Sequence, residues 1–177
     1  MRLHIGCRDR IFNDEWVNLD IQGGEGVDII DDAAELKRVE DGSCDIIYSS
    51  HLLEHFGRND ILSVLRVWHR KLKDGGILRL SVPNFESIVQ RYLKTRDIEE
   101  VLGLMVGSQK NEHEKHLMIF DEKLLTNYLY RAGFRTVAGW NWREVDHSNC
   151  DDYSQAYLPH MDKDNGLLMS LNLEALK

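Results

Sequence analysis

Residues 45–82 read DIIYSSHLLEHFGRNDILSVLRVWHRKLKDGGILRLSV and hold the clearest structural pattern in the chain. Apolar residues recur at three- and four-residue spacing from Asn59 to Leu72, which predicts a helix with one buried face. Short apolar segments at Asp45–Tyr48 and Gly76–Val82 flank this helix and predict strands. Lys73-Asp74-Gly75-Gly76 ends the helix, because glycine is favoured just past the last helical turn. A strand, a helix and a strand in this order predict two parallel strands of one sheet.

The same alternation continues on both sides of this stretch. A second helix is predicted from about Asp121 to Arg131, with Asp121 as its N-cap and Gly133 as its C-terminal stop. We therefore predict an α/β chain with a Rossmann-like, mainly parallel sheet of about seven strands and helices on both faces. The other strand-like segments are Leu3–Ile5, Trp16–Ile21, Val27–Ile30, Phe134–Trp142 and Leu167–Leu173.

Two segments depart from a regular alternation. Gly6 to Val17 is barely long enough for a parallel crossover, which with its helix takes roughly ten to twelve residues or more. We expect the first crossover helix to be vestigial or absent. Tyr92 to His116 is polar and weakly periodic, and we expect a helix and loop inserted there, around 92–116, at the ligand-binding edge of the strands. The 177 residues are expected to form a single domain, 1–177.

Composition limits the possible partners. Hydrophobic residues make up 42% and charged residues 29% of the chain, which is typical of a folded globular domain. Acidic residues outnumber basic ones 30 to 22, so no basic stripe for nucleic acid is expected. No apolar run resembles a signal peptide or a membrane span, which predicts a cytoplasmic protein without membrane insertion. The three scattered cysteines fit reduced thiols.

The ends of the first two predicted strands suggest a nucleoside site. Gly6 directly follows the first strand and lets a ligand approach the backbone. Asp20 ends the second strand, where a carboxylate can accept hydrogen bonds from both hydroxyls of a ribose. The alternative is that Asp20 only forms a turn, which is common for a strand-terminal aspartate.

Three stretches carry a resemblance to a known family: LHIGCR at residues 3–8, VDIIDDAAEL at 27–36 and DIIYSSHLLEHF at 45–56. They resemble the class I S-adenosylmethionine-dependent methyltransferases, especially a small bacterial group with LHxGC and SHxLEHF motifs. The resemblance continues through residues 72–84, 121–134 and 170–175. It covers most of the chain and implies a methyltransferase whose cofactor is S-adenosylmethionine.

The resemblance also implies roles for individual positions. The implied cofactor-binding residues are Gly6, Cys7, Asp20, Asp32, Ala33 and Ser50. Gly6 lies beside the methionine part of the cofactor, Asp20 holds its ribose, and Asp32 receives the exocyclic amine of adenine, which Ala33 helps to frame. Ser50 lies near the sulfonium and the incoming acceptor. Such a cofactor carries its own leaving group, so the protein mainly positions the acceptor and excludes water.

Histidines near the expected ligand edge are further candidates. His51 is the preferred catalytic base, since an imidazole can remove an acceptor proton near neutral pH; the alternative is a hydrogen-bonded loop histidine. His55 is expected to be structural. His113 and His116 have the spacing of two metal ligands, but the sequence offers no third ligand nearby, so no metal site is predicted and a solvated loop is expected.

The glycine loop departs from the family pattern, because Arg8-Asp9-Arg10 stands where further glycine is usual. Arginine there either crowds the methionine part of the cofactor or pairs with its carboxylate.

The preferred function is methyl transfer to oxygen or nitrogen of a small-molecule or sugar acceptor, the sugar following from the resemblance only. One alternative is a non-catalytic binding or assembly module with a degenerate cofactor site. Another is a nicotinamide-dependent oxidoreductase, which the absence of GxGxxG disfavours. The oligomeric state stays open, with a homodimer as one candidate.

Overall fold

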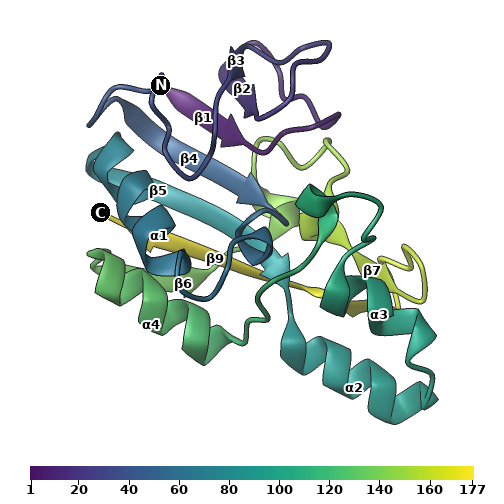
Figure 1. Cartoon of the computed structure of the whole chain (residues 1–177). Helices are drawn as coiled ribbons and strands as arrows, with labels where there is room; N and C mark the ends of the chain where they lie inside the picture. Colours follow the sequence, from purple (N-terminus) through teal and green to yellow (C-terminus); the bar gives the residue numbers. More distant parts are fainter.

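A seven-stranded sheet forms the centre of the molecule (Figure 1). The computed structural model describes all residues, 1–177. The strand order is β3-β2-β1-β4-β5-β9-β6, and β9 runs opposite to the other six strands, which all point the same way. This topology confirms the predicted mainly parallel sheet. The strands are β1 (Arg2–Ile5), β2 (Trp16–Asp20), β3 (Ile29–Ile30), β4 (Cys44–Ser50), β5 (Leu72–Pro83), β6 (Thr136–Gly139) and β9 (Ser170–Leu176).

Two α-helices pack against one face of the sheet. They are α1 (Ile61–Lys71) and α4 (Glu122–Ala132), and their apolar sides form the main core with inward side chains of the strands. The ends of α4 are as predicted: the Asp121 side chain accepts the Leu124 amide N–H at 2.6 Å, and Gly133 ends the helix in the left-handed region with φ +116°. Local capping chemistry therefore sets the limits of this helix.

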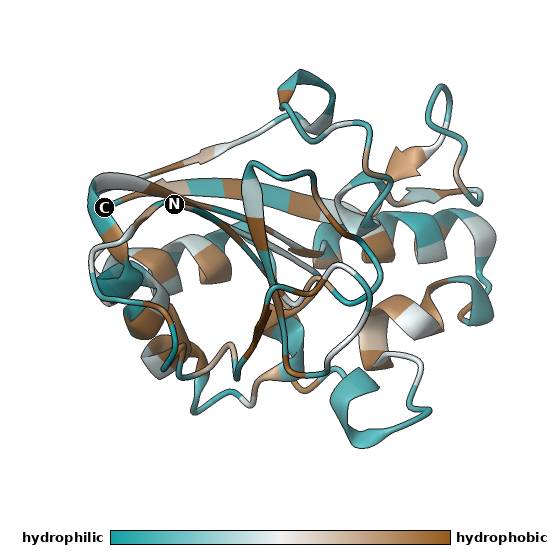
Figure 2. Cartoon of the chain, turned by 90° about the horizontal axis from the view of Figure 1, so that it is seen from above, coloured by the Kyte–Doolittle hydropathy of each residue, from teal (hydrophilic) through white to brown (hydrophobic).

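The opposite face lacks α-helices. His4 and Tyr48 point to this side and pack with Phe12 and Trp16 from the loop after β1 and the start of β2. Two short 3-10 helices, η3 (Trp142–Glu144) and η4 (Tyr153–Gln155), and the loops around them complete the cover. The helices of the second face are therefore short 3-10 helices, because the connections between β1, β2, β3 and β4 contain turns but no helix. The missing helix between β1 and β2 confirms the expectation for the first crossover. Figure 2 shows both hydrophobic and hydrophilic positions along the strands. Successive side chains of a strand point to opposite faces, so the two faces of this sheet can differ in polarity.

A small extension follows β5 at the carboxyl edge of the sheet (Figure 1). It contains α2 (Phe85–Thr95), α3 (Glu99–Val106), η2 (Glu112–Glu114) and a hairpin of β7 (Tyr157–Leu158) and β8 (Leu167–Leu168). Ile88, Val101 and Met169 form its own small core. The expected insertion is one helix and a loop around 92–116, whereas the structure has two α-helices, the first beginning at Phe85. The sequence does carry the signal for α2, since Phe85, Ile88, Val89, Tyr92 and Leu93 recur at helical spacing, but this apolar stripe lies mostly before the expected start at residue 92.

No helix of the chain combines the length and the apolar character that crossing a membrane requires.

Candidate functional site

The carboxyl ends of three neighbouring strands bring the predicted site residues to one edge of the sheet. Ile5 at the end of β1 pairs with Leu19 of β2 and with Ser49 of β4. Gly6, Asp20 and Ser50 each follow one of these three positions, so they lie along the same edge. In open α/β sheets this edge is where ligands bind.

Position 6 requires glycine for two reasons, its backbone conformation and the closeness of Leu52. Its φ of +69° lies in the region that favours glycine, and a Cβ atom there would lie 2.8 Å from Cδ2 of Leu52. Leu52, which the sequence analysis did not single out, therefore packs directly against the glycine. Cys7 beside it is buried, and burial together with the charge of Asp20 raises the pKa of its thiol to about 12. The thiol stays protonated, so Cys7 offers a ligand its backbone rather than a thiolate.

Asp20 stands at the border of an open cleft of about 670 Å³. Its Oδ2 accepts the backbone N–H of Arg8 at 2.8 Å, and its Oδ1 accepts that of Gln22 at 2.9 Å. Each carboxylate oxygen keeps a further lone pair for a ligand hydroxyl. The glycine-containing segment 22–27 forms one wall of the cleft, and residues 8, 9 and 11 form the other. The carboxylate is thus oriented by the backbone and open to a diol.

Asp32 and Ala33 form a tight turn just beyond β3. The Asp32 Oδ1 atom accepts the Ala34 backbone N–H at 2.8 Å, and the carbonyl oxygen of Ala33 accepts the indole N–H of Trp68 at 2.7 Å. The turn is joined to the Asp20 strand end, because Asp31 donates its backbone N–H to the Asp20 carbonyl oxygen. Asp32 itself is exposed, so its carboxylate is accessible to a ligand.

His51 is enclosed rather than open to solvent. Its backbone has φ +49°, and its side chain is 7% exposed. The Ser170 hydroxyl donates to the Tyr153 carbonyl oxygen, so the His51 Nε2–H donates to Ser170 Oγ at 2.9 Å. The Nδ1 atom then faces Glu54 Oε1 at 3.4 Å. Burial lowers the pKa of His51 to about 3 and raises the pKa of Glu54 to about 8, so both groups are uncharged near neutral pH.

Ser50 contributes a second unusual polar group at this edge. Its hydroxyl is buried and has no hydrogen-bond partner, and the same holds for Ser81 on the neighbouring strand, with which it is in register. A buried hydroxyl without a partner costs free energy unless a ligand or water satisfies it. The two hydroxyls are therefore unsatisfied polar groups enclosed near the strand ends.

Arg8 pairs with an acidic residue of the extension. Its Nη2 donates to Oε1 of Glu114 at 3.0 Å, which joins the glycine loop to η2 in the extension. No sequence pattern signals this contact, because the two residues are 106 positions apart. Arg8 thus reaches across from the loop after β1 to the segment on the far side of the strand ends.

The comparisons with known proteins agree with this arrangement. The family model described as "Methyltransferase domain" matches residues 3–138. The chain belongs to this family. The resemblance to methyltransferases stated from the sequence is thereby confirmed at the level of the family, and the matched part of the methyltransferase domain contains the strand ends that carry Gly6, Asp20 and Ser50. A search of curated proteins finds no match.

Solved structures share the fold of this methyltransferase domain along nearly its whole length. A SAM-dependent methyltransferase from Archaeoglobus fulgidus has a TM-score of 0.57 and 17% identity, covering 99% of this chain and 85% of that chain. A possible histamine N-methyltransferase from Thermotoga maritima has a TM-score of 0.60 and 15% identity, with 99% and 81% covered. The 1,6-didemethyltoxoflavin-N1-methyltransferase of Burkholderia thailandensis has a TM-score of 0.58 and 15% identity, with 99% and 70% covered. At these identities the likeness is one of fold.

Proposed function

We propose that this methyltransferase domain binds S-adenosylmethionine and transfers its methyl group to oxygen or nitrogen of a small or carbohydrate-like acceptor. The observation that carries the proposal is Asp20, a backbone-oriented carboxylate at the end of β2 that opens into the cleft. The Burkholderia thailandensis neighbour was solved with S-adenosylhomocysteine, the product form of this cofactor. That structure supports the choice of cofactor.

The chain's own residues would bind the cofactor in parts. Asp20 accepts the ribose hydroxyls, the backbone at Gly6 and Cys7 lies beside the methionine part, and Asp32 with Ala33 meets the adenine. Ser50 supplies a polar contact near the reacting centre. When bound, the cofactor supplies an activated methyl group, so the remaining work of the protein is to orient the acceptor and keep water out.

His51 is our candidate for the group that takes a proton from the acceptor. Its Nε2 donates to Ser170, which leaves Nδ1 as the atom with a free lone pair. Since Nδ1 faces Glu54, the acceptor would have to reach the space between these two side chains. Burial lowers the pKa of His51 to about 3, so this role requires the bound cofactor or acceptor to change the surroundings of the imidazole.

A non-catalytic methyltransferase-like binding or assembly module is the second candidate. Leu52 packs on Gly6, and Arg8 is held by Glu114. Both contacts narrow the space in which the methionine part of the cofactor would lie.

Isothermal titration with S-adenosylmethionine and S-adenosylhomocysteine, with NAD as a control ligand, distinguishes the two candidates. We expect micromolar binding of the first two ligands and at least a tenfold loss of affinity in Asp20→Asn, since the neutral amide cannot replace a carboxylate that accepts two hydroxyls. Asp14→Asn, at an exposed aspartate outside the cleft, is the matched control and should bind normally. Absence of heat with both ligands would contradict the enzyme proposal and favour the module.

A further inference from the structure

Glu54 has an environment that the fold does not account for. The side chain is fully buried, yet neither carboxylate oxygen has a hydrogen-bond partner. The basic groups beside Oε1 are imidazoles, with His51 Nδ1 at 3.4 Å and His116 Nε2 at 3.9 Å, and no lysine or arginine pairs with the residue. Buried carboxylates are normally paired with a cation or bound to a metal. The chain itself provides no such cation for Glu54.

His55 and His116 each present a ring nitrogen whose lone pair is unused. The Nδ1 of His55 hydrogen-bonds to the carbonyl oxygen of Lys115 at 3.0 Å, and the Nδ1 of His116 hydrogen-bonds to that of Leu104 at 3.0 Å. A carbonyl oxygen only accepts, so both Nδ1 atoms carry the proton and both Nε2 atoms keep a lone pair. Histidine ligands of metals are oriented in this way, with the second ring nitrogen donating to a backbone carbonyl.

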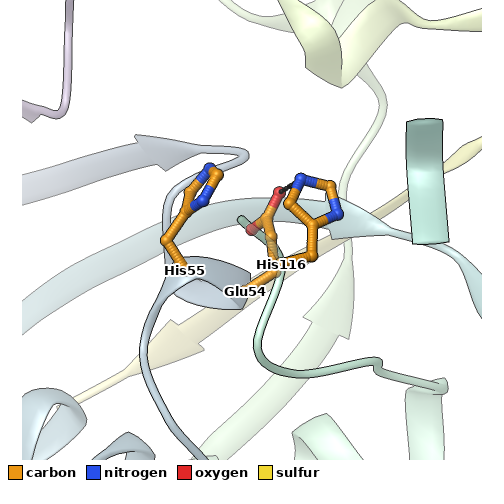
Figure 3. A group of neighbouring side chains, drawn as sticks. All are labelled: Glu54, His55 and His116. Carbon is orange, nitrogen blue, oxygen red and sulfur yellow. Dashed lines mark ion pairs between the residues drawn. The ribbon is translucent and has the colours of Figure 1, made fainter. Parts of the chain in front are cut away.

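The three side chains converge from two distant segments. Glu54 and His55 belong to the short 3-10 helix η1 (Leu53–His55) directly after β4, and His116 follows η2. In the view of Figure 3, the Glu54 carboxylate lies between the two imidazole rings. One ligand atom from each residue can be chosen so that all lie within 4.8 Å of one another. Ligand atoms about 2.1 Å from a tetrahedral ion are about 3.4 Å from one another. The ligand atoms of this cluster would therefore have to move closer together by about 1.4 Å at most to bind an ion.

We propose that Glu54, His55 and His116 bind a divalent first-row transition metal ion such as Zn²⁺ or Co²⁺. Binding of the ion would displace the proton that the buried Glu54 carboxyl holds in the metal-free protein, and the ion then supplies the positive charge that the carboxylate needs. The two Nε2 lone pairs complete a set of two imidazoles and one carboxylate. Imidazole ligands favour such ions over Mg²⁺ and Ca²⁺, which prefer oxygen ligands alone. Three protein ligands leave a coordination position for water or an oxygen of a bound molecule.

The cluster differs from the pair that the sequence suggested, because the structure brings His116 but not His113 to Glu54 and His55. His116 is half-buried against α3, whereas His113 is exposed and lies outside the cluster. Gly107 lets the backbone at Glu114 come close to the end of α3, because a Cβ atom at position 107 would lie only 1.9 Å from the Glu114 carbonyl oxygen. The other two ligands, Glu54 and His55, belong to η1, about 60 residues earlier in the chain.

Metal binding to tag-free protein stripped with a chelator tests the proposal independently of S-adenosylmethionine. Zn²⁺ is titrated calorimetrically, and Co²⁺ is followed by its visible ligand-field absorption. We expect one ion per chain, a rise in thermal midpoint that the chelator reverses, and no comparable effect of Mg²⁺. His116→Ala and Glu54→Gln should each weaken binding at least tenfold, and His113→Ala, three residues from His116, should bind like the unmodified protein.

Glu54→Gln also keeps the proposal testable if an alanine variant unfolds, because the amide has nearly the same shape as the carboxylate and carries no charge. It should retain the metal-free thermal midpoint but lose the rise caused by Zn²⁺. Failure of Zn²⁺ and Co²⁺ to bind with one-to-one stoichiometry would overturn the proposal. Binding that is weakened by His113→Ala as much as by His116→Ala would also overturn it.

Discussion

At the scale of single residues, Gly6 combines a conformational and a steric requirement. Its φ of +69° disfavours any side chain, and the methyl group of an alanine would press on Leu52. We expect Gly6→Ala to lower the free energy of unfolding by about 1–3 kcal/mol. Urea unfolding followed by circular dichroism measures the change.

Leu52→Ala separates the two causes of this destabilisation. Without the Leu52 side chain, an alanine at position 6 no longer makes the close contact but keeps the unfavourable positive φ. Gly6→Ala should therefore lower the free energy of unfolding less in the Leu52→Ala protein than in the unmodified protein. Equal effects of Gly6→Ala with and without Leu52 would show that only the backbone conformation matters.

At the scale of structural elements, the Arg8–Glu114 ion pair joins the loop after β1 to η2 across the strand ends. If the proposed cofactor binds there, Arg8 has a second possible partner in the carboxylate of the methionine part. Glu114→Gln removes the competing charge, and we expect affinity for S-adenosylmethionine to rise by about fivefold at most, since exposed ion pairs contribute roughly 0.2–1 kcal/mol.

Titration calorimetry of the Glu114→Gln variant measures this gain, with Glu112→Gln as the control. Glu112 lies on the same short helix and pairs with Lys115 instead. Weaker cofactor binding in Glu114→Gln would mean that the ion pair holds the loop in its binding conformation rather than competing with the ligand.

The elements also show which parts of the structure could be predicted from sequence. The limits of α4 follow from local periodicity and caps, and the short crossover after β1 excludes a helix by length alone. Periodicity predicts α1, but its N-cap side chain makes no capping hydrogen bond and the helix ends at Leu72, before the glycines predicted to stop it. The meeting of Glu54 with His116 depends instead on how α3 and the turn at Gly107 fold back onto η1. No local pattern encodes that return, so the sequence did not reveal that His116 meets Glu54 and His55.

At the scale of the whole molecule, the sheet face without α-helices is closed by an aromatic and histidine cluster. The Phe12 ring stacks on His4 with centroids 4.1 Å apart and on His147 with centroids 4.6 Å apart. Burial lowers the pKa of His4 to about 4, and burial together with Arg79 lowers that of His147 to about 3. The Arg79 guanidinium donates to His147 Nε2 at 3.1 Å, which a protonated ring could not accept.

The cluster therefore makes stability depend on pH in a definite direction. In the unfolded chain a histidine has a pKa of about 6.5, so between pH 6.5 and about 4 the unfolded state binds a proton that folded His4 does not. Its contribution to stability is complete above pH 6.5 and is lost as the pH falls.

Replacing His4 isolates this effect, with a slope of up to about 1.4 kcal/mol per pH unit. The His4 Nδ1–H donates to Asn18 Oδ1 at 3.3 Å, and the amide of His4→Gln keeps a donor there without titrating. Besides Asn18, the ring is faced by Phe12 and Tyr48.

We expect the free energy of unfolding, measured in urea at pH 7, 6 and 5, to fall less steeply in His4→Gln than in the unmodified protein. The exposed His160→Gln variant should keep the original slope. Equal slopes in all three proteins would show that His4 binds a proton to the same extent in the folded and unfolded states.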